Sequence, residues 1–288
     1  MSRNNEDRLG ATMIDAEVPP QATGQLNPTP NNNLSFVAPT EFVEIPSGGV
    51  FYPEGHSLHQ QTCVEIKHMT AKEEDILSDK ALLKKGLAID RFLKSVIIDK
   101  DINVDSLLVG DKNAILVAAR ITGYGAEYDT KLICPVCFAH GRQEFDLTQC
   151  EVTNSDSLGE NGVELTQNGT FLLTTPKTGV SVECKLFTGK EEKNLLAAIE
   201  RRKKNKLPSA DLTTQLKMMI VSVNGETDRQ YINSFVENIP ASDSRHLRTI
   251  YQKCVPNVSL RQTYCCSSCE AETEIEVPFT SDFFWPNT

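Results

Sequence analysis

Two Cys-x-x-Cys pairs are the residues of this 288-residue chain whose types and spacing point most directly to chemistry. Cys134 and Cys137 lie in the stretch LICPVCF, and Cys266 and Cys269 lie in the stretch YCCSSCE. A tight turn with two cysteines three positions apart can offer both thiolates to one ion, and two such turns complete the tetrahedral set of four cysteines that zinc prefers. The two pairs are separated by far more than the roughly 15–20 residues usual in a zinc ribbon, so their spacing alone does not join them.

Three arrangements of these thiols remain open at this point. The two pairs could share one structural zinc ion per chain, each half could hold its own ion, or the pairs could bind no metal. One ion per half would need His140 or Cys150 in the first half and Cys265 in the second. Strands flank both pairs, whereas a redox-active Cys-x-x-Cys lies at a helix N-terminus. Four thiolates also close the ligand shell that catalytic zinc keeps open.

The remaining chemistry-bearing residues have simpler interpretations. No P-loop, GxSxG or HExxH motif is present, so the sequence predicts no enzyme. His56 and His59 are expected in a surface loop, and the basic run over 200–206 is expected to be a solvated helix end. The chain has nine cysteines, of which three in apolar surroundings are expected to be plain buried residues: Cys63, Cys184 and Cys254.

Composition narrows the class of partner and the compartment. The formal net charge is −10 and the isoelectric point is about 5.1, so nucleic acid is an unlikely partner for the surface as a whole. No run of 18 apolar residues and no N-terminal apolar leader segment is present, which predicts neither a membrane span nor secretion. An odd cysteine count without a leader indicates a reducing compartment.

An internal repeat gives the two cysteine pairs equivalent positions. Residues 64–77 match residues 182–195 at eight of fourteen positions. Asp111 precedes Cys134 by 23 residues, and Asp243 precedes Cys266 by the same 23 residues. Two copies imply a duplicated structural unit rather than a solenoid. If the copies pack about a pseudo-twofold axis, their cysteine pairs can meet on that axis and share one zinc ion.

The elements that must position these pairs are predicted from local patterns. Each copy reads as a β-hairpin, then helices, then a strand, the Cys pair and a second strand, which makes the fold class α+β. Capping boxes begin the first helix of each copy at Thr70 and at Thr188. A second helix is expected around residues 92–97 and around residues 216–220. Asp111 and Asp243 are expected to be N-caps of the third helix.

The predicted organisation has three parts and an aromatic end. Residues 1–40, rich in Asn, Pro and Gln, are expected to form a flexible arm. The first α+β repeat is expected over 41–160 and the second over 161–288. The terminal aromatic residues are expected either to close the core or to dock into a partner: Phe283, Phe284 and Trp285.

Several phrases together resemble a known family: IPSGGVFYP, MTAKEEDIL, LICPVC and the terminal VPFTSDFFWP. Over about residues 42–288 the chain resembles the baseplate hub and hub-assembly proteins of T-even-like contractile-tailed bacteriophages, as an internally duplicated member. The resemblance implies a structural role without catalysis in the virion tail baseplate, after assembly in the host cytoplasm. It implies other hub, tail tube or tape-measure proteins as partners, and a homo-oligomer in the assembled tail. The alternative is a cytosolic zinc-ribbon adaptor that binds nucleic acid or a replication or transcription partner.

Overall fold

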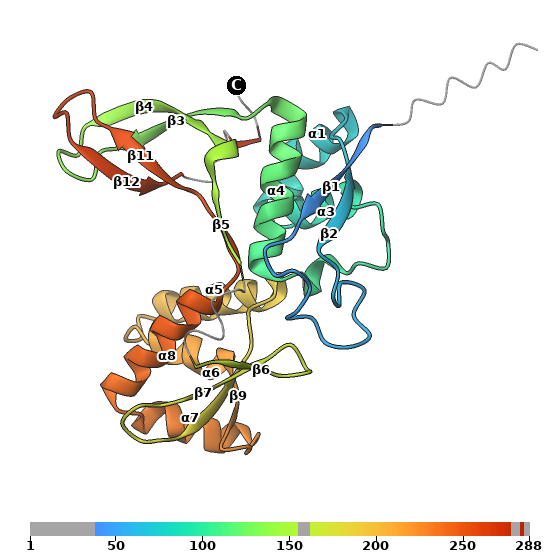
Figure 1. Cartoon of the computed structure of the whole chain (residues 1–288). Coiled ribbons are helices and arrows are strands. Elements are labelled where there is room, and N and C mark those ends of the chain that lie inside the picture. Colours follow the sequence, from blue (N-terminus) through green and yellow to red (C-terminus); the bar gives the residue numbers. More distant parts are fainter. Residues whose placement is uncertain (1–37, 155–161, 278–282, 285–288) are drawn as a thin grey trace, which may run out of the picture. The chain divides into compact units, whose positions relative to one another are not determined.

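The computed structural model describes residues 38–154, 162–277 and 283–284. Residues 38–288 belong to one compact unit, whose described part combines helices with small antiparallel sheets (Figure 1). The α+β fold class is therefore confirmed. The arm predicted over residues 1–40 falls almost wholly outside the described residues, and so does the boundary predicted between residues 160 and 161.

The first half contains two antiparallel hairpins. Val43 lies opposite Val64 in the first hairpin, and Leu132 lies opposite Gly141 in the second. The elements are, in order, β1 (Thr40–Glu44), β2 (Cys63–Lys67), α1 (Ala71–Ser78), α2 (Lys80–Lys84), α3 (Ala88–Val96), the 3-10 helix η1 (Val104–Ser106), α4 (Val109–Tyr124), β3 (Glu127–Ile133), β4 (His140–Asp146), the 3-10 helix η2 (Leu147–Gln149) and β5 (Glu151–Thr153).

The second half contains a four-stranded sheet in the order β6-β7-β8-β9 and ends with a hairpin of β11 and β12. Residue 220, expected in a helix, instead begins β9, because β8 offers a free edge for it. The elements are β6 (Glu164–Leu165), β7 (Phe171–Thr174), β8 (Ser181–Cys184), α5 (Gly189–Lys204), α6 (Asp211–Met219), β9 (Ile220–Val223), α7 (Arg229–Asn238), α8 (Ala241–Cys254), β10 (Asn257–Ser259), β11 (Arg261–Cys265) and β12 (Glu272–Glu276).

Both predicted capping boxes are present at the starts of α1 and α5. The amide N–H of Thr70 donates to Glu73, and the amide N–H of Thr188 donates to Glu191, each over 3.0 Å. A lysine six residues before each glutamate adds an ion pair to the same carboxylate. Each box therefore satisfies helix-end donors and also ties the preceding strand to the helix.

Asp111 and Asp243 do not cap their own helices, which corrects the sequence prediction. Each lies in the first turn of its helix, α4 or α8, and each is fully buried. Asp111 accepts hydrogen bonds from the backbone and hydroxyl of Ser47 and from the hydroxyl of Tyr52. Asp243 accepts from the amides of Lys177 and Thr178. Each carboxylate thus fastens a loop between two paired strands of its own half.

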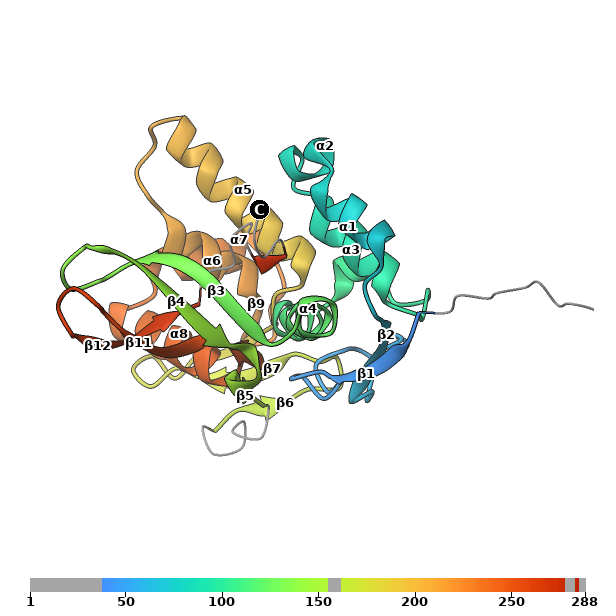
Figure 2. The same ribbon diagram turned by 90° about the horizontal axis from the view of Figure 1, so that it is seen from above.

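Helix α4 lies between elements of both halves. It contacts β1, β2 and α3 of the first half and α5 and β10 of the second, and it is seen end-on in the middle of Figure 2. The buried apolar side chains of the two halves form one continuous core, from Val43 to Phe284. The halves are consequently held together by apolar burial as well as by any ion.

The aromatic residues near the C-terminus lie in this core. Phe283 and Phe284 are almost fully buried. The ring centroid of Phe283 lies 5.3 Å from that of Tyr128, and the centroid of Phe284 lies 5.3 Å from that of Phe92. The structure thus places both rings where they close the core of the unit. Trp285 lies outside the described residues.

The two hairpins that carry the cysteine pairs, β3–β4 and β11–β12, are called the terminal hairpins. They are positioned by a short sheet that joins the halves. Strand β5, which follows the first hairpin, pairs antiparallel with β10, which precedes the second. A Cβ atom at Gly110 would lie 1.9 Å from the carbonyl oxygen of Pro256, so α4 can cross the chain here only because residue 110 is glycine. Both hairpins therefore leave the same region of the core side by side.

Candidate metal centre

The same turn is built twice, once at the tip of each hairpin. In the first turn, the N–H of Cys134 donates to the carbonyl of Ala139 and the N–H of Phe138 donates to the carbonyl of Cys134. In the second, Cys266 and Ala271 make the first of these bonds, at 3.1 Å, and the Glu270 N–H donates to Cys266 at 2.9 Å. Phe138 and its counterpart Glu270 both have left-handed backbones, with φ of 59° and 56°.

Backbone N–H groups of each turn point at the sulfur of its first cysteine. The amides of Val136 and Cys137 lie 3.4 and 3.5 Å from the Sγ atom of Cys134. The amide of Ser268 lies 3.4 Å from the Sγ atom of Cys266. Hydrogen bonds of this kind favour the charged form of the acceptor. The turns are therefore prepared to hold thiolates.

The four sulfur atoms meet although they come from distant parts of the chain. The Sγ atoms of Cys134 and Cys269 are 3.8 Å apart, and those of Cys137 and Cys266 are 3.7 Å apart. All four lie within 4.8 Å of one another. These cysteines are free thiols rather than disulfides. Four close cysteines in this arrangement could hold a metal ion.

The separations fit a tetrahedral ion. A metal bound at about 2.3 Å by four sulfurs would place those sulfurs ~3.8 Å apart, and two sulfur–sulfur distances between the hairpins are 3.7 and 3.8 Å. A set made only of thiolates suits soft or borderline metals and does not suit magnesium or calcium, which prefer oxygen. The donor set and its geometry therefore both fit a four-coordinate thiolate site.

The acidities of the thiols show why the cluster favours a cation. The amides of Ser268 and Cys269 and the hydroxyl of Tyr264 donate to Cys266 and lower its pKa to about 6. The pKa of Cys269 is raised to about 12, because the surrounding sulfurs outweigh the amide of Ala271, which acts in the opposite direction. Four sulfurs at this distance cannot all be negatively charged without a counter-ion.

A small apolar cluster surrounds one side of the site. The first cysteine of each pair is buried, and so is Tyr264, with Leu132 and Ile275 packed against them. A Cβ atom at Gly141 would lie 2.7 Å from the Tyr264 hydroxyl, so glycine makes room for the group that donates to the Cys266 sulfur. The second cysteine of each pair is exposed, which leaves a path by which an ion can enter.

Two glutamine side chains fix how the hairpins face each other. Gln143 of β4 donates to the carbonyl of Thr263 and accepts from the amide of Cys265. Gln262 of β11 donates to the carbonyl of Asp146 over 2.7 Å. These contacts set the relative position of β4 and β11 and therefore the distance between the two cysteine pairs.

The alternative of one ion per half does not match the side chains that come together. His140, Cys150 and Cys265, which it requires, are absent from the close group of four cysteines. Cys150 lies 3.9 Å from the amide nitrogen of Gln262, and the exposed Cys265 lies 3.8 Å from a carboxylate oxygen of Glu272. The close sulfur contacts between Cys134 and Cys269 and between Cys137 and Cys266 join the two halves.

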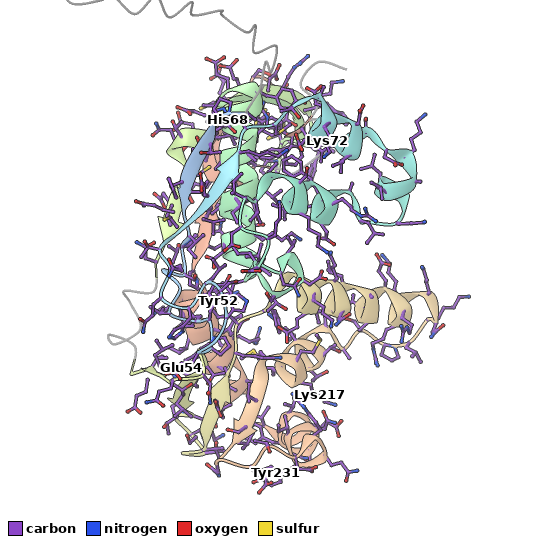
Figure 3. The ribbon with its side chains drawn as sticks, turned by 90° about the vertical axis from the view of Figure 1, so that its right-hand side faces the viewer. Tyr52, Glu54, His68, Lys72, Lys217 and Tyr231 are labelled. Atoms are coloured by element: carbon purple, nitrogen blue, oxygen red, sulfur yellow. The ribbon has the colours of Figure 1, made fainter. Side chains whose placement is uncertain are left out.

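The other residues with possible chemistry have structural partners. His56 contacts Ser106 at 2.8 Å, and His59 contacts the carbonyl of Tyr52 at 2.6 Å; the loop that carries them adjoins Tyr52, which is labelled in Figure 3. Cys184 and Cys254 are buried as expected, and burial raises the pKa of Cys254 to about 11. Cys63 is only half-buried, because it begins the first paired strand after a surface loop.

Sequence reasoning missed the residues that support the cysteines. Tyr264 lies two positions before Cys266, and on a strand this spacing puts both side chains on one face. This two-residue spacing could have been used to predict that Tyr264 lies beside the cysteine site. Gln143 and Gln262 gave no signal of their own, because their bonds depend on how the two hairpins pack.

Comparisons with known proteins identify no relative: no family model, curated protein or solved structure matches the chain. Within the part of the chain that the structure describes, none of the helices combines the length and the apolar character needed to span a bilayer.

Proposed function

We propose that the four cysteines bind one structural zinc ion per chain, which fastens the two terminal hairpins to each other. The observation that carries this proposal is the close approach of four sulfurs, all within 4.8 Å of one another, contributed by two segments more than a hundred residues apart. Zinc and iron both accept tetrahedral thiolate sets, and zinc is the usual ion of two Cys-x-x-Cys turns. Four thiolates leave no position for water, so the ion has a structural role.

The metal content of the purified protein tests this proposal. Elemental analysis after gentle purification is expected to give about one zinc ion per chain. Cys134→Ser should remove the zinc, whereas Cys265→Ser should keep it, because Cys265 adjoins a ligand but lies outside the group of four. Two ions per chain, none, or a reddish iron-containing protein would each contradict the proposal.

We also propose that the described unit arose by duplication of one hairpin–helix–hairpin element. The equivalent capping boxes, the buried aspartates of α4 and α8 and the two cysteine turns support this proposal. Replacing residues 134–139 with the sequence of residues 266–271 should preserve zinc binding, because both segments form the same turn. Loss of zinc from a folded chimera would show that the two turns are not equivalent.

For the whole protein we propose a structural or assembly role in the baseplate hub of a contractile bacteriophage tail, with other hub, tail tube or tape-measure proteins as partners. The support is the resemblance of the motifs described above, together with a ligand set suited to holding hairpins rather than to catalysis. Mass spectrometry of purified tails and of baseplate assembly intermediates should detect the chain. Its absence from both would contradict the proposal.

A zinc-ribbon adaptor for nucleic acid is the second candidate, and one observation favours it. The C-terminal end of α5 carries four consecutive basic residues in an otherwise acidic chain. If they bound a phosphate backbone, affinity for DNA would fall steeply with salt. We expect no such binding at physiological ionic strength, and a steep salt-dependent titration would reverse the order of the two candidates.

A further inference from the structure

The tip of the first hairpin exposes three large apolar side chains within six residues. Ile133, Val136 and Phe138 are 57%, 55% and 75% exposed. We call these three residues the apolar tip. Apolar side chains that gather on an exposed turn usually mark a contact surface, whereas isolated ones need no explanation.

The second hairpin shows that the turn itself does not need these side chains. At the equivalent positions it carries Cys265, Ser268 and Glu270, yet it makes the same hydrogen bonds and presents its sulfurs in the same way. Phe138 also occupies a left-handed backbone position, which disfavours a bulky residue. The apolar tip therefore serves neither the turn nor the sulfurs, which leaves an intermolecular role.

An apolar groove elsewhere on the unit has room for such a tip. It lies beside α5, the start of α4 and the end of α8, and its volume is about 270 Å³. Leu186, Phe187, Leu195 and Val255 are among its lining residues. A cavity of roughly 150 Å³ with such a lining can hold a benzene ring, so an aromatic side chain fits. Leu196, at the groove, is 56% exposed.

Several exposed charges near the tip and near the end of α5 are opposite in sign. The second turn, which adjoins the tip through the four sulfurs, carries exposed carboxylates at Glu270 and Glu272. Helix α5, whose end extends away from its neighbours in Figures 2 and 3, lines the groove with Glu192. Beyond the groove it carries exposed cations: Arg201, Lys203 and Lys204. Oppositely charged surfaces steer association and disfavour the wrong orientation.

We propose that a second copy of this chain inserts its apolar tip into the groove beside α5, so that copies associate head to tail. Two tips facing each other would bring like charges at Glu270 together, and three side chains expose far less than the roughly 800 Å² per partner of a standard interface. The groove supplies additional apolar surface, and the end of α5 beyond it supplies opposite charge. Contacts between two different surfaces give a closed ring or an open chain of copies.

The zinc-loaded full chain, studied by sedimentation velocity over a wide concentration range in reducing buffer, tests the proposal. We expect reversible association with a dissociation constant on the order of micromolar, as befits a small interface. Phe138→Gly should raise that constant at least about tenfold. Its melting temperature should be unchanged or higher, because glycine suits the left-handed backbone. Phe42→Ser, which removes a 69% exposed ring on β1, is the matched control and should associate normally.

Mixing two variants distinguishes head-to-tail contact from every symmetric alternative. Leu196→Ser, which alters the groove, should prevent association just as Phe138→Gly does. An equimolar mixture should form one-to-one dimers and nothing larger, since only one intact tip and one intact groove remain complementary. A wild-type chain that stays monomeric at high concentration, a mixture that stays monomeric, or a Phe42→Ser variant as weak as Phe138→Gly would overturn the proposal. None of these outcomes depends on the baseplate role.

Discussion

At the scale of single residues, the metal centre depends on groups that are not ligands. The Tyr264 hydroxyl donates to the sulfur of Cys266, and this bond raises the pKa of Tyr264 to about 12. Because Tyr264 is buried between the hairpins, bulk water cannot take the place of its hydroxyl as a donor to the sulfur. It therefore positions the sulfur and stabilises its negative charge.

Tyr264→Phe should weaken metal binding without removing a ligand. The ring still fills the apolar cluster, but the sulfur loses a donor, so we expect the zinc dissociation constant to rise by about 10–100-fold. Competition with a chelator of known affinity measures the change. Tyr231→Phe is the control, since Tyr231 is half-exposed on α7, where it is labelled in Figure 3. Equal zinc affinity in Tyr264→Phe and the wild type would show that the hydroxyl has no role.

Glu73 makes stability depend on pH in a predictable direction. Burial alone would raise its pKa, but hydrogen bonds from Lys67, Ser95 and Thr70 outweigh burial and lower the pKa to about 2. Folding thus favours the ionised form. The carboxylate contributes its full stabilisation above its ordinary pKa of about 4.5 and loses it as the pH falls through about 2.

The variant Glu73→Gln isolates this contribution. At pH 7 it should lower the free energy of unfolding by about 2 kcal/mol, because the partly buried Lys67 loses the charge of its buried partner. The difference from wild type should shrink as the pH falls from about 4.5 to about 2. Denaturant unfolding of the zinc-free chains at several pH values measures it. The exposed Asp75→Asn on the same helix serves as control, and a pH-independent difference would refute the assignment.

At the scale of elements, the two buried aspartates connect helices to loops. Asp111 accepts from the Ser47 amide at 2.9 Å and from the Tyr52 hydroxyl at 2.8 Å, and that hydroxyl also accepts from the amide of Leu108. One carboxylate therefore holds the loop after β1 and, through Tyr52, the residue before α4. Burial raises the pKa of Asp111 despite these donors.

Replacing Asp111 with asparagine should detach this loop. The amide group has one acceptor oxygen in place of two, so at least one buried donor loses its partner, and we expect a loss of about 2–3 kcal/mol in unfolding free energy. Hydrogen exchange should rise in residues 45–52 before it rises in α4. Asp101→Asn, at an exposed position before the same helix, should leave both unchanged. Unaltered exchange in 45–52 of the Asp111 variant would contradict the fastening role.

At this scale, contacts between residues close in the sequence could be predicted, whereas contacts between distant residues could not. The Thr70 and Thr188 capping boxes were predicted correctly because a cap is a local pattern within four residues. Asp111 and Asp243 also looked like caps, but their partners lie 59 to 66 residues away, where local patterns carry no information. The meeting of the cysteine pairs was predictable for a different reason: the repeat made their positions equivalent.

At the scale of the whole molecule, the four-cysteine cluster lies apart from the main core. The apolar core of the described unit includes residues of both halves and continues through α4, whereas Cys134, Tyr264 and Cys266 form a second, small cluster. Leu132 and Ile275 pack against both clusters. The ion pair of Asp90 in α3 with Lys193 in α5 also links the halves. The halves therefore have connections that do not involve metal, and the ion acts on the hairpins.

Metal removal should accordingly loosen the hairpins before it affects the core. After treatment with a zinc chelator, peptides that cover β3–β4 and β11–β12 should lose protection from hydrogen exchange together, because each holds two of the four ligands. Peptides of α4 and α8 should remain protected by the continuous core.

Two further exchange measurements, on a variant and on the zinc-restored chain, test this expectation. Cys134→Ser, without chelator, should reproduce the chelated pattern in both hairpins, although the change lies in only one of them. Restoring zinc to the wild-type chain should restore protection in both hairpins at the same metal concentration, because one ion binds to both. If only the first hairpin responded to Cys134→Ser, each pair would act alone. If α4 and α8 exchanged as fast as the hairpins, the ion would be required for the fold of the entire unit.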